Sequence, residues 1–103
     1  MPIQVIVLIE TVPGERQAVL DAFNRNAVTV RAEAGCIEYA AYADAGGFNP
    51  PIVPFGADTL VVLERWERVE DLNAHARAPH TRAYQAEVKD RVARRTVHLL
   101  SAV

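Results

Sequence analysis

The stretch LERWERVEDLNAHARAPH, residues 63 to 80, holds most of the side chains in this sequence that could do acid–base chemistry. Glu64 and Trp66 stand two positions apart in a strand-like run, and His75 and His80 follow on either side of a proline. Imidazole titrates close to neutral pH, so a positioned histidine can remove or return a proton during a reaction. Either histidine alone is more often a core residue that bonds the backbone. A carboxylate, an indole and two imidazoles are costly to bury together in a small domain, and this combination favours a pocket.

Side-chain alternation suggests which face of the strand these residues occupy. Glu64 and Trp66 share one face, because residues two apart in a strand point the same way. The other face, with Val61 and Leu63, is apolar and suits packing against helices. We therefore expect Glu64 and Trp66 on the sheet face that the helices leave open. His75 falls on the buried side of the helix that follows.

The other two histidines are placed by the same periodicities. His80 begins an apolar stripe that continues with Tyr84 and Val88 at four-residue spacing, and His98 alternates with apolar residues in the last strand. A metal held jointly by His75, His80 and His98 is the less favoured alternative. His75 and His80 are five positions apart across a proline, whereas a helical metal pair is usually spaced i, i+4. The sequence therefore predicts no metal site.

Hydrophobic periodicity and turn residues divide the chain into alternating strands and helices. The predicted strands cover residues 3 to 9, 36 to 44, 59 to 66 and 96 to 103, and the predicted helices cover residues 15 to 34, 69 to 77 and 79 to 94. A chain of 103 residues indicates one domain, residues 1 to 103. The order β-α-β-β-α-β is the ferredoxin-like pattern of an α+β fold, with an antiparallel sheet and helices on one face.

The strands are largely apolar on both faces, although the helices can cover only one face. No further segment remains to cover the second face, so a second copy of the chain is the expected cover. The sequence predicts a homodimer in which two sheets face each other.

A loop rich in proline and glycine, AGGFNPPIVPFGA at residues 45 to 57, separates the second and third strands. Loops of this length are uncommon in small domains and often have a function. The loop also contains Phe48, Ile52, Val53 and Phe55, which a solvated segment would expose at a cost. We expect an ordered lid or interface arm, with a disordered surface loop as the alternative.

Composition excludes several classes of function. The net charge of −2 gives no reason to expect a nucleic-acid partner, and the basic residues near Arg94 are interpreted as a solvated helix end. Neither GxGxxG nor GxxxxGK[ST] occurs, so no nucleotide fingerprint is present. Cys36 is the only cysteine, which excludes an intrachain disulfide. The N-terminal apolar run is too short for a signal peptide or a membrane span, so we expect a cytoplasmic protein without a membrane partner.

Several segments resemble, in order, the antibiotic biosynthesis monooxygenase domain family, and the resemblance covers essentially the whole chain. They are VPGERQAVLDAF, AEAGCIEYAAY and LERWERVEDLNAHARAPHTRAY, together with the final strand. The specific motifs are Gly-Cys-x-x-Tyr (Gly35, Cys36, Tyr39), Glu-x-Trp (Glu64, Trp66) and His-x-x-x-Pro-His (His75, Pro79, His80). The loop after Asp44 is similar to an insertion in the bacterial quinol monooxygenase branch. The haem-degrading branch is less similar, because the first strand here lacks that branch's asparagine.

The resemblance implies a dimeric α/β barrel that oxidises quinols or polycyclic phenols with O₂, without flavin, haem or metal. The expected partners are a small aromatic substrate, O₂ and a second copy of the chain. His75 or His80 would be the catalytic base, with Glu64 orienting an imidazole. The candidates for binding the aromatic ring are Trp66, Tyr39, Tyr84, His98, Phe48 and Phe55. Two alternatives stay open on this fold: an isomerase or degradative enzyme for a small carbonyl signalling metabolite, and a non-catalytic small-molecule-binding dimer.

Overall fold

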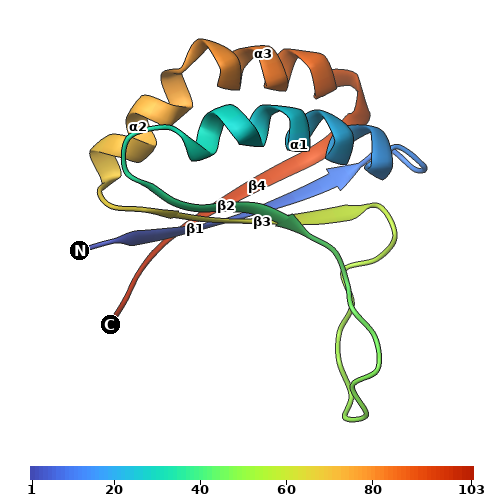
Figure 1. Ribbon diagram of the computed structural model, residues 1–103. Helices are drawn as coiled ribbons and strands as arrows, with labels where there is room; N and C mark the ends of the chain where they lie inside the picture. Colours follow the sequence, from blue (N-terminus) through green and yellow to red (C-terminus); the bar gives the residue numbers. More distant parts are fainter.

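The computed structural model describes residues 1–103, and its elements follow the predicted order (Figure 1). They are β1 (Ile3–Thr11), α1 (Arg16–Arg31), β2 (Cys36–Tyr42), β3 (Thr59–Trp66), α2 (Val69–Arg77), α3 (Pro79–Val88), the short 3₁₀ helix η1 (Lys89–Arg91) and β4 (Val92–Ser101). None of the helices combines the length and the apolar character that crossing a membrane requires.

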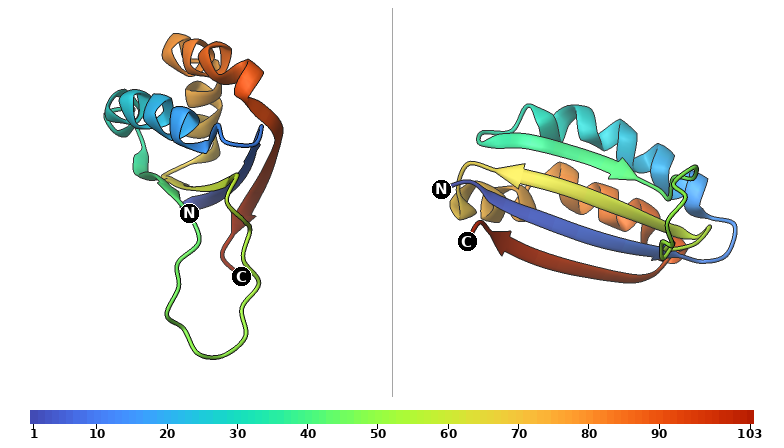
Figure 2. Two further views of the ribbon diagram at one scale, coloured as in Figure 1. Left: turned by 90° about the vertical axis from the view of Figure 1, so that its right-hand side faces the viewer. Right: turned by 90° about the horizontal axis from the view of Figure 1, so that it is seen from below.

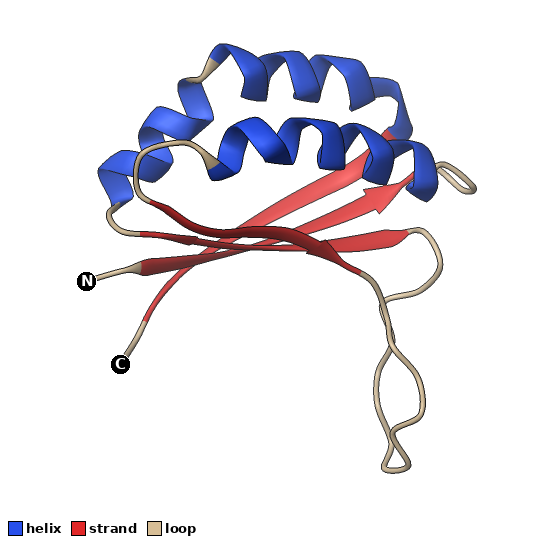
Figure 3. Cartoon of the chain, in the orientation of Figure 1, coloured by secondary structure: helices blue, strands red, loops and turns tan.

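The strands form one antiparallel sheet in the order β2-β3-β1-β4. All helices lie on the same face of this sheet, so the molecule has two layers (Figure 3). The view from below shows the opposite face without any helix (Figure 2). This arrangement confirms the predicted ferredoxin-like α+β fold.

Glu64 and Trp66 lie on the helix side of the sheet, so the prediction that they face away from the helices was wrong. Trp66 is fully buried and Glu64 is 4% exposed, whereas Val61 and Leu63 are half-buried on the other face. β3 is apolar on both faces, so the number of apolar residues on each face did not show which face meets the helices. The large indole determines it, because only the space between helices and sheet can enclose a side chain of that size.

The core lies between α1 and the sheet. Val19, Phe23, Ala27 and Val30 recur at helical spacing and are at most 1% exposed. The Phe23 ring stacks on Tyr39 of β2, with 4.8 Å between ring centroids. The contact joins the middle of α1 to the middle of β2, and Tyr39 on its other side contacts His75 of the candidate site.

The third helix is shorter than predicted, and the last strand begins earlier. α3 ends at Val88 and β4 starts at Val92, so Arg94 and Arg95 are strand residues opposite Glu10 and Ile9 of β1. The interpretation of these arginines as a solvated helix end was wrong. Pairing with β1 gives the backbone a partner along nine residue pairs, which outweighs the helix propensity of this segment. One consequence is that Arg95 faces the helices.

The loop between β2 and β3 extends away from the sheet on the side opposite the helices (Figure 1). Its base is closed by the Asp44 carboxylate, which accepts hydrogen bonds from the backbone N–H groups of Phe55 and Gly56 at 2.9 and 2.8 Å. Phe48 and Val53 are 67% and 94% exposed. The loop does not cover any cavity of its own chain, which leaves the interface arm as the prediction for this segment.

We expect Gly35→Ala to destabilise the fold more than Gly14→Ala. Both glycines have positive φ, +80° and +83°, where an alanine costs about 1–2 kcal/mol. A Cβ at residue 35 would lie 2.1 Å from Asp71 Oδ2 and 2.8 Å from its Cβ, whereas residue 14 has open space. Displacing α2 should add about 1–3 kcal/mol to the cost at residue 35. Urea unfolding of the two variants measures this difference, and equal losses would contradict it.

Candidate active site

A carboxylate between two imidazoles forms the centre of the candidate site. Glu33 follows the end of α1, and its Oε2 lies 2.9 Å from Nδ1 of His75 and 2.8 Å from Nε2 of His80. A carboxylate can only accept hydrogen bonds, so both ring nitrogens donate to it. Glu33 thereby fixes the tautomer of each imidazole, and the remaining nitrogen of each ring is left without a proton in the neutral state.

His75 is held by aromatic rings as well as by Glu33. It is 6% exposed, and its ring centroid lies 4.9 Å from that of Trp66 and 5.5 Å from that of Tyr39. Thr81 Oγ1 is 3.4 Å from the same Nδ1 that Glu33 engages. Nε2 of His75 has no hydrogen-bond partner in the protein. The imidazole is therefore fixed on one side and available for a ligand on the other.

Glu64 is a second buried carboxyl group close to His75. Its Oε1 accepts a hydrogen bond of 3.0 Å from Trp66 Nε1. Burial raises the pKa of Glu64, and the Trp66 hydrogen bond and the nearby His75 and Arg95 only partly oppose this effect. Glu33, not Glu64, is the carboxylate that orients the histidines, so the predicted orienting role of Glu64 was wrong.

A cavity of about 240 Å³ lies between the sheet and the two helices α2 and α3. His75 and Glu64 are in its wall, so the structure brings together two of the three predicted catalytic residues. The other lining residues are Val5, Val7, Leu72, Asn73, Ala76, Thr81, Gln85, Arg95 and Val97. An apolar cavity with a few convergent polar groups is typical of a small-molecule site.

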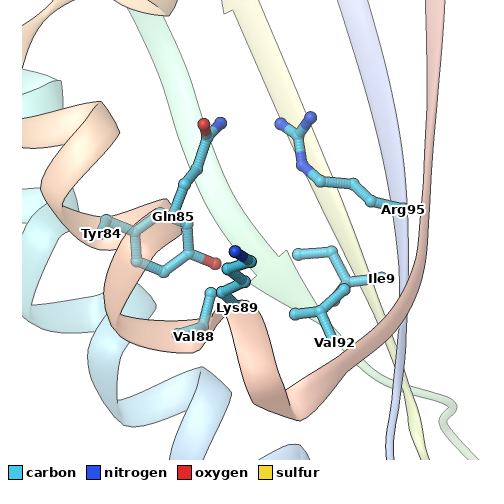
Figure 4. A pocket seen from close by; sticks show the side chains of 7 residues that line it. All are labelled: Ile9, Tyr84, Gln85, Val88, Lys89, Val92 and Arg95. Atoms are coloured by element: carbon cyan, nitrogen blue, oxygen red, sulfur yellow. The ribbon is translucent and has the colours of Figure 1, made fainter.

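A second cavity of about 280 Å³ continues along α3 (Figure 4). The two cavities share Gln85 and Arg95 as lining residues, so they are adjacent. In Figure 4 the Arg95 side chain extends from β4 toward the helix side, and Tyr84 and Lys89 line the opposite wall. A planar ligand beside His75 could therefore extend past Arg95 toward Lys89.

Four of the other predicted site residues lie close to His75 or along α3, and three lie elsewhere. Tyr84 lines the second cavity, and His80 bonds Glu33 without facing either cavity. Trp66 and Tyr39 are buried behind His75, so they support the imidazole and do not form the cavity wall. The residues that the structure does not bring to the site within one chain are His98, Phe48 and Phe55.

His98 is separated from the site by the sheet itself. It pairs with Ile6 and is exposed on the face away from the helices. Phe48 and Phe55 belong to the extended loop and are 67% and 57% exposed. A metal held by all three histidines, the less favoured alternative, is thus inconsistent with the structure.

Sequence reasoning missed Glu33 and Arg95. Glu33 stands two positions before Gly35, the glycine that ends the α1 segment, so it is brought next to α2 by a tight turn. The available signal was the position of Glu33 beside the chain reversal at Gly35, in a sequence whose later helix α2 contains a histidine. Arg95 gave no such signal, because it was assigned to a helix and its strand alternation was not considered.

One group of ligand atoms has a composition that could hold a metal ion. Glu33, His75 and His80 each offer one donor atom, and the three atoms lie within 4.8 Å of one another. The cluster combines two imidazole nitrogens with one carboxylate oxygen, a donor set that suits zinc and other divalent transition metals.

Comparison with known proteins places the chain among curated relatives of similar length. It is 40% identical over 100 residues to "Probable quinol monooxygenase YgiN" of Escherichia coli (strain K12), with 93% of each chain covered. The YgiN protein of Shigella flexneri matches with the same identity and coverage.

Solved structures agree with this fold. Rv0793 from Mycobacterium tuberculosis is 28% identical with a TM-score of 0.81, covering 100% of this chain and 96% of that one. A conserved protein from Methanosarcina mazei Go1 has a TM-score of 0.85 at 17% identity, covering 100% and 94%, and shows the fold alone. The family profile described as antibiotic biosynthesis monooxygenase matches residues 2–87. The chain therefore belongs to the antibiotic biosynthesis monooxygenase family.

Proposed function

We propose that the protein is a monooxygenase that oxidises a quinol with O₂ without a cofactor, using His75 as the base. The observation that carries this proposal is the placement of His75 in the wall of a cavity that combines apolar and polar side chains, with Nδ1 fixed by Glu33 and Nε2 free. The 40% identity to a protein described as a probable quinol monooxygenase supports the choice of substrate class.

The first step is removal of a phenolic proton by Nε2 of His75. A phenol titrates near pH 10 and imidazole near 6.5, so only a small fraction of the bound quinol is phenolate at any moment. The reaction with O₂ consumes this phenolate and draws further proton transfer forward. The phenolate transfers an electron to O₂ far more readily than the phenol does. Glu33 stabilises the imidazolium that forms, because its carboxylate already accepts the hydrogen bond from Nδ1.

The overall reaction balances without another reactant. The quinol and O₂ give a hydroxyquinone and water, so one oxygen atom enters the ring and the other leaves with two protons. His75 returns its proton to the departing oxygen. Glu64, whose pKa is raised by burial, can supply and recover another proton within the same cavity.

Arg95 and Gln85 are the groups suited to orient the substrate. Both line the two adjacent cavities, and Arg95 forms no ion pair within the chain. A guanidinium beside the cavity favours the negative charge of a phenolate or of a reduced oxygen species. Val5 and Val7, each 2% exposed, give the cavity an apolar floor on the sheet, against which a planar ring can pack.

The proposal includes a homodimer that pairs the sheet faces without helices, as the family resemblance implies. We name this surface the bare face: Ile6, Leu8, Ala40, Tyr42, Val61, Leu63, Thr96, His98 and Leu100. Tyr42 and Leu100 are 46% and 47% exposed in the single chain, and a second copy would cover them. The extended loop projects on the same side and would reach the partner subunit (Figure 2). A cytoplasmic location stays a prediction.

The test is oxygen consumption by metal-free, flavin-free protein on adding a reduced naphthoquinone. We expect a rate well above the autoxidation of the quinol in the same buffer, together with a hydroxylated quinone as the product. A rate equal to the autoxidation control would contradict the proposal. Saturable binding of the quinol without turnover would instead favour the non-catalytic binding dimer.

A further inference from the structure

In the cluster of Glu33, His75 and His80, the Glu33 carboxylate has no permanently charged partner. Glu33 is only 15% exposed in its side chain, and its ion-pair partners are the two histidines alone. Arg31, the nearest arginine in sequence, donates instead to the backbone carbonyl of Tyr39. With both imidazoles neutral, the cluster carries one uncompensated negative charge in a partly desolvated place.

We propose that this cluster is a binding site for a divalent transition-metal ion of the zinc class. His75 would bind through Nδ1, His80 through Nε2 and Glu33 through Oε2, the three atoms that lie within 4.8 Å of one another. The ion would neutralise the carboxylate and use two imidazole nitrogens, the ligands that zinc takes most readily in proteins.

The distances show how far the side chains must move to hold an ion. Ligand atoms around a tetrahedral zinc ion lie about 3.3 Å from one another, given bonds of about 2.0–2.1 Å. The two contacts to Glu33 measure 2.9 and 2.8 Å, so each must open by about half an ångström. The two imidazole nitrogens lie within 4.8 Å of each other, so they must approach by up to about 1.5 Å. The three ligands come from α2, α3 and the turn after α1, so rotations of the side chains are sufficient.

The exposure of His80 provides the route for the ion and its fourth ligand. The His80 side chain is 28% exposed, whereas that of His75 is 8% exposed. Water can therefore reach the cluster from the outer surface, on the side of His80, without passing through the cavity. A three-ligand site with an open position leaves room for such a water molecule.

Metal binding would block the proposed base, and this consequence rests on the proposed function. Coordination at Nδ1 displaces the proton from that nitrogen, and the neutral imidazole then carries its proton on Nε2. Nε2 is the atom that would accept the phenolic proton, so an occupied cluster cannot start the reaction. The ion is accordingly an inhibitor and not a cofactor.

The direct test is calorimetric titration of zinc chloride into protein freed of metal by chelation. We expect one ion per chain for the natural sequence, and more than tenfold weaker binding for Glu33→Gln and for His80→Gln. His98→Gln is the matched control, because it removes a histidine on the other face of the sheet and should bind zinc normally. Thermal melting confirms that each variant is folded.

Two outcomes would overturn the site: no saturable binding to the natural protein, or unchanged affinity in folded Glu33→Gln and His80→Gln. Oxygen consumption then separates the site from the function. A protein that binds zinc but oxidises no quinol even when freed of metal contradicts the proposed function and leaves the metal site standing. Full quinol oxidation with zinc bound contradicts the inhibition, because Nε2 would still be accepting a proton.

Discussion

Replacing His75 by glutamine should lower the rate of quinol-dependent oxygen consumption about 10²–10⁴-fold, the usual contribution of a general base. Glutamine keeps the polarity and approximate size of the side chain but cannot take up a proton near neutral pH. His75 is the only histidine in the wall of the cavity, so no other imidazole can replace it. Oxygen-electrode measurements over a range of pH test this, with quinol loss followed in parallel.

The matched control is Glu70→Gln, which introduces the same side chain at an exposed position of the same helix. It should retain the natural rate. Glu33→Gln should give an intermediate loss of about 10–100-fold, because it removes the group that orients and stabilises the imidazole. The split between kcat and KM identifies this positioning role. Glu33 does not line the cavity, so its replacement should lower kcat and leave KM little changed.

An unchanged rate in folded His75→Gln would remove this histidine from the mechanism. A loss in Glu33→Gln that appears only as a raised KM or as a smaller fraction of folded protein would indicate that Glu33 only stabilises the fold near the site.

The order of elements could be predicted from the sequence because each carries its own period. The run IQVIVLI and the four-residue recurrence in α1 cannot exchange their structures without exposing apolar side chains. The boundary between α3 and β4 was harder. The residues from Lys89 to Arg95 have good helix propensity, and only pairing with β1, which lies far away in sequence, turns the last of them into a strand.

The composition of the site was predicted better than its position. Glu64, Trp66 and His75 were identified, yet Glu64 and Trp66 were assigned to the space between two sheets, and the structure places them with His75 between sheet and helices. Both faces of β3 are apolar, so local alternation does not distinguish them. Glu33 meets His75 in a contact across 42 residues, and its only mark in the sequence is the chain reversal at Gly35 beside it.

The bare face leads to the second large prediction: Ile6→Glu should convert a dimer into monomers. Ile6 pairs with Leu63 and His98 near the middle of the sheet, so its side chain would lie at the centre of an interface between two such faces. Two copies related by a twofold axis would bring two carboxylates into this apolar centre. Burying charge without a partner costs several kcal/mol, which is enough to weaken association more than a hundredfold.

Sedimentation velocity at several protein concentrations measures the change. Val28→Glu is the control, because it adds the same charge at a site on α1 that is 71% exposed and should leave the mass unchanged. Leu63→Glu, on the neighbouring strand, tests the same surface independently if Ile6→Glu fails to fold. A natural protein that sediments as a monomer at all concentrations would contradict the dimer. A folded Ile6→Glu protein that keeps the dimer mass would place the interface elsewhere, and the extended loop would then need another partner for its exposed Phe48 and Val53.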